Sequence, residues 1–226
     1  LPAALEMMDR MIIQAVEASF QFGFPTDAEA VLIVELDGHE AGLERQAAQT
    51  VAILQAQGAR EVRLAKDDQE RSRLWMARKK AVGCVGRLAP SKVTQDGVIP
   101  RSQLPGILRA IASIGARYGL RIANVFHAGD GNLHPIVLFD ERDPEQVRKV
   151  VAAGQEILEA CLAVGGSITG EHGIGVEKIG MMDRMFSPSD LAVMGHLRDA
   201  FNPEGLCNPG KLLPVARTCV ESRKRP

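Results

Sequence analysis

The sequence predicts an α+β fold in which a largely antiparallel sheet carries helices on one face. Short apolar runs alternate with amphipathic helical stripes along the 226 residues. Two runs, Leu120 to Phe126 and Leu133 to Phe139, flank Asp130-Gly131, the dipeptide preferred in a two-residue type I′ hairpin turn. The last helical stripe is followed by no further strand. We therefore expect a ferredoxin-like arrangement with a C-terminal helical tail.

The first part of the chain alternates strand and helix. Val31 to Leu36 is a short apolar run closed by Asp37-Gly38, which predicts a buried strand and a turn. An amphipathic stripe from Leu43 to Leu54 predicts a helix that stops at Gly58. Glu61 to Ala65 alternates apolar and polar residues, which predicts a second strand.

The middle of the chain continues this alternation. The charged stretch from Asp67 to Lys80 carries Leu, Trp and Arg at helical spacing and predicts a helix, and Thr94 to Pro100 has an extended pattern. Ser102 is the expected N-cap of a further helix, whose apolar stripe runs from Leu104 to Ile114.

Two more helices follow the hairpin. One has an apolar stripe from Val147 to Cys161 and ends at Gly165-Gly166. The other runs from Ser187 to Phe201, opens with Ser-Pro, which is favoured at a helix start, and closes before Asn202-Pro203.

Composition excludes several classes of protein. The 27 Lys and Arg residues nearly balance 28 Asp and Glu residues, which argues against electrostatic nucleic-acid binding. No apolar run approaches the roughly 18 residues that span a bilayer. The cysteines are scattered without a CxxC pair, as is usual in a reducing compartment. We therefore expect a cytoplasmic protein without a transmembrane segment.

The first loop with concentrated chemistry is HAGDGNLH, from His127 to His134. With Asp130-Gly131 as the turn, His127 lies opposite His134. Directly opposed Cβ atoms are about 4.5–5.5 Å apart, so two imidazoles could share one metal ion. From spacing alone the alternative, an ordinary hairpin with two surface histidines, is slightly favoured because no third ligand is supplied.

The second loop, GEHGIG from Gly170 to Gly175, supplies one. Glu171 and His172 fall on an irregular segment, where functional side chains are often displayed. Two histidines and one carboxylate with an open position form a catalytic zinc set. His172 is then a candidate acid or base, because the ordinary pKa of histidine lies near neutrality. The alternative is that GEHGIG only builds a tight helix entry.

Both loops, together with the FNPEGLCNPGK segment from Phe201 to Lys211, resemble signatures of a known family. It is the C-terminal domain of FAD-linked oxidases of the vanillyl-alcohol oxidase type, in particular glycolate oxidase D subunits and D-lactate and D-2-hydroxyglutarate dehydrogenases. LEMMD near the start, VELDG at 34–38 and LWMARKKA at 74–81 match as well. The resemblance continues to about residue 213 and implies that residues 1–213 form the cap, or substrate, domain.

The resemblance also implies roles for individual residues. His127, His134 and Glu171 would bind a divalent metal, expected to be zinc or another borderline divalent ion such as manganese, and His172 would be the catalytic base. Arg78 would pair with the substrate carboxylate, for which a planar guanidinium is well suited.

Further implied roles concern a second positively charged residue that would bind the substrate, and the residues that would contact the cofactor. Lys92 would be a second substrate-binding cation. Asn132, Asn208 and Lys211 would approach FAD from the cap side.

In this family an FAD-binding domain precedes the cap, and the glycine clusters here do not form a GxGxxG fingerprint after a strand. We therefore expect the chain, which begins at Leu1, to be an excised fragment whose partner is an N-terminal FAD-binding domain. Residues 186–213 would be a helical tail packed on that domain, and residues 214–226 a disordered tail.

The expected function is FAD-dependent oxidation of a D-2-hydroxy acid, glycolate or D-lactate, to the 2-oxo acid, with the fragment alone inactive. Association with other oxidase subunits, and through them with a membrane, is a further expectation. Two alternatives stay open: a stand-alone ferredoxin-like binding or regulatory module without redox activity, and metal-dependent hydrolysis by the same three ligands.

Overall fold

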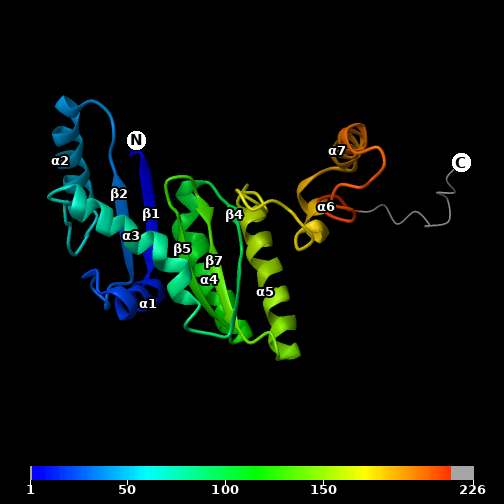
Figure 1. Cartoon of the computed structure of the whole chain (residues 1–226), viewed down its shortest axis with the longest axis horizontal. Coiled ribbons are helices and arrows are strands. Elements are labelled where there is room, and N and C mark those ends of the chain that lie inside the picture. The colour runs from blue at the N-terminus through cyan, green and yellow to red at the C-terminus, as the bar shows by residue number, and fades with distance from the viewer. Residues whose placement is uncertain (1, 215–226) are drawn as a thin grey trace, which may run out of the picture.

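The computed structural model describes residues 2–214 and contains one open sheet flanked by helices (Figure 1). The sheet has seven strands in the order β2-β1-β5-β6-β4, with β7 beside β5 and β3 beside β7. The strands are β1 Ala4–Asp9, β2 Ala30–Glu35, β3 Ser91–Thr94, β4 Gly97–Val98, β5 Arg121–His127, β6 Asn132–Leu133 and β7 Pro135–Phe139. The strand pairings of the described residues are all antiparallel. The predicted α+β class with a largely antiparallel sheet is confirmed.

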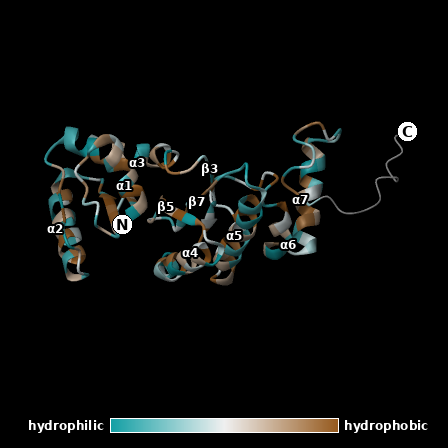
Figure 2. Ribbon diagram, turned by 90° about the horizontal axis from the view of Figure 1, so that it is seen from below, coloured by the Kyte–Doolittle hydropathy of each residue, from teal (hydrophilic) through white to brown (hydrophobic). Residues whose placement is uncertain are grey.

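Helices cover both faces of this sheet, whereas the sequence predicted one covered face. The helices are α1 Arg10–Phe20, α2 Glu40–Ala56, α3 Asp68–Val85, α4 Leu104–Tyr118, α5 Pro144–Ala163, α6 Met182–Met185 and α7 Pro188–Phe201, with 3₁₀ turns at Arg101–Gln103 and Ile179–Met181. Figure 2 shows α1 and α3 on one side of β5 and β7, and α4 and α5 on the other.

Successive residues of the central strands explain the two covered faces, because they point in opposite directions. Ala123 and Val125 of β5 belong to the core under α1 and α3, and Phe126 belongs to the core under α4 and α5. In β7, Ile136 and Val137 divide in the same way.

The sequence analysis missed β1 and α1. β1 is a central strand between β2 and β5, and the side chains of Met7 and Met8 pack into cores on opposite faces. The buried face of β1 carries the polar Glu6 beside Met8, and the other face carries the partly buried Leu5 and Met7, so apolar and polar residues do not alternate along the strand. Asp9 caps α1 by accepting a hydrogen bond from the Ile12 N–H, at 3.0 Å.

Two other local predictions were wrong. Residues 61–65 form no strand, and Leu64 is 59% exposed, so the alternation of this segment is not matched by a paired neighbour among the described residues. Ser102 does not cap α4, because it lies in a 3₁₀ turn that runs directly into the helix at Leu104.

The last helix of the described chain extends away from the sheet (Figure 1). Ser187 caps α7 through a capping box with Asp190, as the Ser-Pro start suggested. α7 has no buried residue, and Phe201 is 84% exposed. The predicted disordered tail 214–226 lies, apart from Pro214, outside the described residues. No helix within residues 2–214 has the length and apolarity to cross a membrane.

Candidate active site

The hairpin between β5 and β6 differs in register from the predicted one. His127 pairs with Asn132 and not with His134, so the connection is the four-residue segment 128–131. Only Gly131 of the Asp130-Gly131 dipeptide has a positive φ, 75°, which rules out a type I′ turn at that dipeptide. His134 is two residues beyond Asn132 and is therefore the diagonal neighbour of His127 on the same face. The two imidazole centroids lie 5.3 Å apart, so the predicted proximity of these histidines is found with a corrected register.

His134 lies between strands β6 and β7, opposite the polar residue Asp96. Thr94 pairs with Ile136 and Gly97 with Leu133, which puts Asp96 across from His134. Pro135 follows His134 and has no N–H to donate, so the strand breaks there. The Asp96 carboxylate and the His134 imidazole consequently meet at a gap in the ladder, with 3.9 Å between Oδ1 and Nδ1.

The Asp96 carboxylate organises the GEHG loop, which is residues 170–173. An isolated bridge between Val98 and Ser167 brings the chain back to the sheet after α5. Oδ2 of Asp96 then accepts a series of hydrogen bonds from the loop. The donors are Thr169 Oγ1 at 2.6 Å and the N–H groups of Gly170, Glu171 and His172 at 3.0, 3.2 and 2.9 Å. This one carboxylate therefore fixes the backbone that displays Glu171 and His172.

A buried ammonium completes this anchor. Lys178 is 5% exposed, and its Nζ lies 3.3 Å from Oδ2 of Asp96, which is fully buried. Burial alone would raise the pKa of Asp96, but hydrogen bonds from Thr169, His172 and Gly170 and the charge of Lys178 outweigh it and hold the pKa well below its usual range. Asp96 is therefore a buried carboxylate ion whose charge is balanced by the neighbouring ammonium of Lys178.

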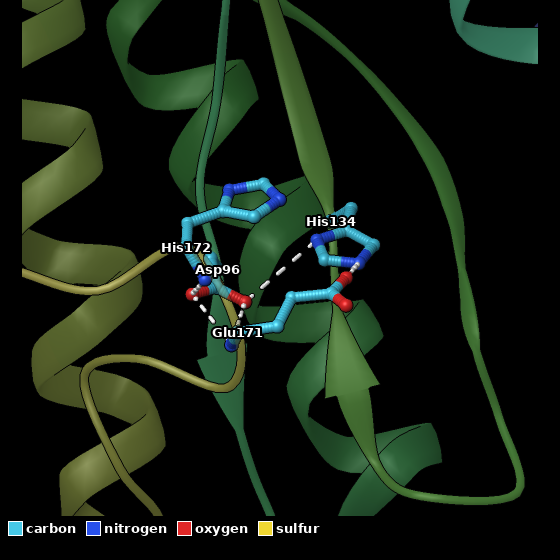
Figure 3. Close-up of side chains that lie close together, drawn as sticks. All are labelled: Asp96, His134, Glu171 and His172. Atoms are coloured by element: carbon cyan, nitrogen blue, oxygen red, sulfur yellow. Dashed lines mark hydrogen bonds and ion pairs between the residues drawn. The ribbon is translucent and has the colours of Figure 1, made fainter.

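Glu171 links the two loops (Figure 3). Its Oε1 lies 2.9 Å from Nε2 of His134 and 3.4 Å from Nε2 of His127. The ring of His172 stacks on that of His134, with centroids 5.0 Å apart and an interplanar angle of 10°. Burial, followed by the neighbouring His127 and His172, lowers the pKa of His134, and Glu171 and Asp96 offset this only in part. The lowered pKa favours the neutral imidazole, which is the form that binds metals.

The donors at this junction fit a divalent ion. The possible ligand atoms of Asp96, His134, Glu171 and His172 lie within 4.8 Å of one another. Asp96 is the least suitable of these ligands, since its Oδ2 already accepts several hydrogen bonds. Glu171 is half exposed, and its Oε1 faces the imidazoles of His134 and His127, so mixed nitrogen and oxygen donors meet at this carboxylate. His127 itself is not one of the four residues whose possible ligand atoms all lie within 4.8 Å of one another.

A hollow of about 380 Å³ opens beside these donors and is lined by Val98, His127, Asp130, Asn132, Gly170 and Glu171. Asn132 is 7% exposed, and its Oδ1 has no hydrogen-bond partner within the described chain. Gly170 allows this packing, because a Cβ there would lie 2.5 Å from the Asn132 side chain. A buried acceptor without a partner beside a hollow is suited to a bound molecule.

Arg78 reaches the site indirectly. Its Nε donates to Oε2 of Glu6 at 2.7 Å, and Oε1 of Glu6 lies 2.6 Å from Nδ1 of His127. The structure does not bring Lys92 to this cluster, because its Nζ donates to the carbonyl of Val82.

Asn208 and Lys211 also lie apart from the cluster. They contact each other and α7 in the C-terminal segment, where Arg198 donates to the carbonyls of both. The backbone N–H of Leu212 donates to the Gly175 carbonyl at 2.8 Å, which ties this segment to the end of the second glycine-rich loop.

Sequence reasoning missed Glu6, Asp96 and Lys178. Each acts through a partner at least 72 positions away in the sequence, so no local spacing reveals it. Glu6 and Lys178 do occur within the LEMMD and GVEK segments that carried the resemblance, whereas Asp96 stood in a segment interpreted only as extended.

Comparison of the sequence with protein-family models identifies a domain of FAD-linked oxidases. The chain belongs to the family described as FAD linked oxidases, C-terminal domain, which matches residues 1–212. It is similar to the glycolate oxidase subunit GlcD of Escherichia coli strain K12, with 47% identity over 221 residues that cover 98% of this chain and 44% of the relative. The GlcD subunit of Bacillus subtilis is 36% identical, over 100% of this chain and 47% of its own length. A probable mitochondrial D-lactate dehydrogenase of Danio rerio is 29% identical over 97% of this chain.

Two solved structures share the fold of this chain. Substrate-bound p-cresol methylhydroxylase has a TM-score of 0.68 and 12% identity, over 92% of this chain and 46% of that one. The 4-ethylphenol oxidase of Gulosibacter chungangensis has a TM-score of 0.63 and 16% identity, over 93% and 48%. At such identities the likeness concerns the fold alone. The chain spans less than half the length of the curated relatives described above.

Proposed function

We propose that this chain is the cap, or substrate, domain of an FAD-dependent dehydrogenase that oxidises a D-2-hydroxy acid, glycolate or D-lactate, to the 2-oxo acid. One observation carries the proposal: two histidines from the hairpin converge with Glu171 and His172 beside a hollow. The glycolate oxidase and D-lactate dehydrogenase relatives support the substrate class.

His127, His134 and Glu171 would hold a divalent ion, with zinc as the first choice because two imidazoles and a carboxylate are a common catalytic set for it. When bound, the ion would supply Lewis acidity at the substrate hydroxyl, and FAD would supply the hydride acceptor. The chain's part would be to bring the three donors together where the two loops meet, with His127 and Glu171 lining the hollow.

His172 would move the proton. It stands against His134, so its imidazole is next to the donors and exposed on the surface of the GEHG loop. As the hydride leaves C2 of the substrate, the hydroxyl proton would pass to the His172 imidazole, and the carbonyl of the 2-oxo acid forms.

Arg78 would bind the substrate carboxylate. Glu6 engages only its Nε, and within the described chain its two terminal amino groups make no hydrogen bond. Those two groups form the pronged end that matches a carboxylate.

The flavin-binding surface would include Asn132 beside the hollow and, more distantly, the segment of Asn208 and Lys211. An FAD-binding domain would precede this cap, and residues 186–213 would pack against it. The exposed apolar side chains of α7 and its continuation support this arrangement. They are Val193, Leu197, Phe201 and Leu206, exposed by 66%, 61%, 84% and 72%.

A reducing compartment suits the thiols, because Cys84, Cys161 and Cys207 are free and the first two are buried. We place the protein in the cytoplasm on this basis, with attachment to other oxidase subunits as its route to a membrane. Cell fractionation with and without those subunits tests this placement.

The experiment on the proposed function compares this chain alone with a holoprotein, defined as the chain together with its FAD-binding domain. The isolated chain should purify colourless, because edge contacts cannot offset the entropy lost in immobilising FAD. In the holoprotein, anaerobic D-lactate or glycolate should bleach the flavin. His172→Ala should slow the bleaching by about 10²–10⁴-fold with FAD content unchanged.

The matched control is His39→Ala, which removes an exposed histidine at the start of α2 and should leave the rate unchanged. Stoichiometric FAD on the isolated chain, or a full bleaching rate in His172→Ala, would contradict the proposed function.

A further inference from the structure

Glu6 is a buried carboxylate that no step of the proposed chemistry uses. Its side chain is 8% exposed, although it belongs to a strand at the beginning of the chain. Burying a carboxylate is costly unless charged or hydrogen-bonding partners compensate it. The partners of Glu6 therefore indicate why it is there.

The sheet register places Glu6 at the site. Glu6 of β1 is directly opposite His127 of β5, so both side chains lie on the same face. α3 packs on this face, and its Arg78 is 13% exposed beside Glu6. The position of Glu6 is thus fixed by backbone pairing and does not depend on a flexible loop.

The two oxygens of Glu6 serve two different residues. Oε2 lies 2.7 Å from Nε of Arg78, and Oε1 lies 2.6 Å from Nδ1 of His127. A carboxylate that only neutralised Arg78 would be expected to use both oxygens in a bidentate pair. The second oxygen is instead committed to the imidazole.

The contact with Nδ1 has a consequence for the other side of the imidazole. A carboxylate oxygen can only accept, so the contact selects the tautomer of His127 in which the Nδ1–H donates a hydrogen bond to Glu6. In that neutral tautomer Nε2 has the free lone pair, and Nε2 lies 3.4 Å from Oε1 of Glu171. A carboxylate behind a histidine in this way fixes the ring orientation and raises the donor strength of the outward nitrogen.

We propose that Glu6 is a positioning residue that orients His127 toward the metal and at the same time holds Arg78 by Nε, leaving the pronged end of the guanidinium for substrate. This inference rests on the metal site of the proposed function. It assigns to β1 the task of setting the distance between the metal donors and the carboxylate-binding group.

The test is zinc titration of the 226-residue chain by calorimetry, together with the visible spectrum of its cobalt(II) form. Glu6→Gln has only one oxygen and cannot serve both partners, so zinc affinity should fall by about 10–100-fold. The cobalt bands should also change, because the orientation of one imidazole ligand changes. If Glu6 had a merely structural role, Glu6→Gln would lower the thermal stability without altering the cobalt spectrum of the folded protein.

Three variants make the comparison specific. Glu35→Gln disrupts a similar ion pair between strand β2 and α3, with Arg71 at 2.9 Å, and should leave zinc affinity unchanged. Arg78→Met keeps the contact between Glu6 and His127 and should bind zinc within about threefold of wild type, well under the loss expected for a missing carboxylate. If Glu6→Gln unfolds, Glu6→Leu/Arg78→Met removes both charges of the pair, a change that buried pairs often tolerate, and should still show the weakened binding.

His134→Ala separates the two levels of the argument. If His134→Ala loses zinc while Glu6→Gln, or the folded double variant, binds it with wild-type affinity and spectrum, the role of Glu6 is overturned and the metal site stands. If wild type and His134→Ala bind zinc equally, the proposed metal site is wrong, and the inference about Glu6 fails with it.

Discussion

The hairpin and the GEHG loop meet at the same site but are held in different ways. His127 is placed by strand pairing, and His134 lies between the paired strands β6 and β7, so the backbone ladder of β5, β6 and β7 supports both. The GEHG loop has no strand or helix of its own and is held by the carboxylate of Asp96. One half of the site therefore depends on many distributed hydrogen bonds, and the other half depends on one buried side chain.

This difference teaches where the site is vulnerable. A substitution in the hairpin meets a sheet that shares the strain among many bonds. A substitution at Asp96 leaves the N–H groups of the loop and the ammonium of Lys178 without their acceptor at once. Buried groups that lose their partner cost more than the lost bond was worth.

The largest effect should come from Asp96→Asn. The amide keeps the shape but removes the charge that balances Lys178, so the free energy of unfolding should fall by about 3–5 kcal/mol. Asp130→Asn removes the same charge from an exposed position in the hairpin and should change it by less than about 0.5 kcal/mol. Urea denaturation measures both, and equal losses in the two variants would remove the distinction between the loops.

Acid should remove the contribution of Asp96 to the free energy of unfolding. An unfolded aspartate titrates near pH 3.9, and the pKa of Asp96 in the folded protein is lower. Its stabilising contribution is therefore complete above the unfolded pKa and is lost as the pH falls below about 4. The difference in unfolding free energy between wild type and Asp96→Asn should be constant near neutrality and shrink at lower pH. A difference that stays constant from pH 7 to pH 3 would show that the charge of Asp96 is not what holds the loop.

Two glycines give the smallest contrast. A Cβ on Gly131 would lie 2.1 Å from the Ile99 carbonyl oxygen, whereas a Cβ on Gly173 would meet nothing within 4 Å, and both residues have positive φ, 75° and 78°. Gly173→Ala should cost about 1 kcal/mol for its backbone conformation. Gly131→Ala should cost about 1–3 kcal/mol more, because the sheet backbone has to move. Thermal denaturation of the two variants checks this order, which fails if Gly173→Ala is the more damaging.

Periodicity predicted much of the fold but not the burial of its centre. α2, α4 and α5 were expected from their apolar stripes, α3 from a charged stretch with Leu, Trp and Arg at helical spacing, and α7 from its Ser-Pro start and Asn-Pro end. β1 was missed because apolar and polar residues do not alternate along the strand. The sequence did not show that β1 and β2 extend the sheet beyond β5. It therefore did not predict the second layer of helices either.

The sequence predicted that four candidate side chains lie close together, but it did not predict the residues that support them. The clustering of His127, His134, Glu171 and His172 in two glycine-rich loops is visible in the sequence, and the structure brings the four together. The predicted register was wrong by two residues because the Asp-Gly dipeptide was taken as a two-residue turn. Asp96 could not be identified, since its role depends on contacts made 73 to 76 positions further along the chain.

X-ray absorption at the zinc edge of the zinc-loaded chain tests most directly whether the two loops converge on one ion. The account predicts one zinc per chain with nitrogen and oxygen neighbours near 2.0–2.2 Å, about two imidazoles in the signal, and no sulfur. His134→Ala should remove one imidazole from the signal or abolish binding. Thiolate scattering at about 2.3 Å, or an unchanged spectrum in His134→Ala, would contradict the account.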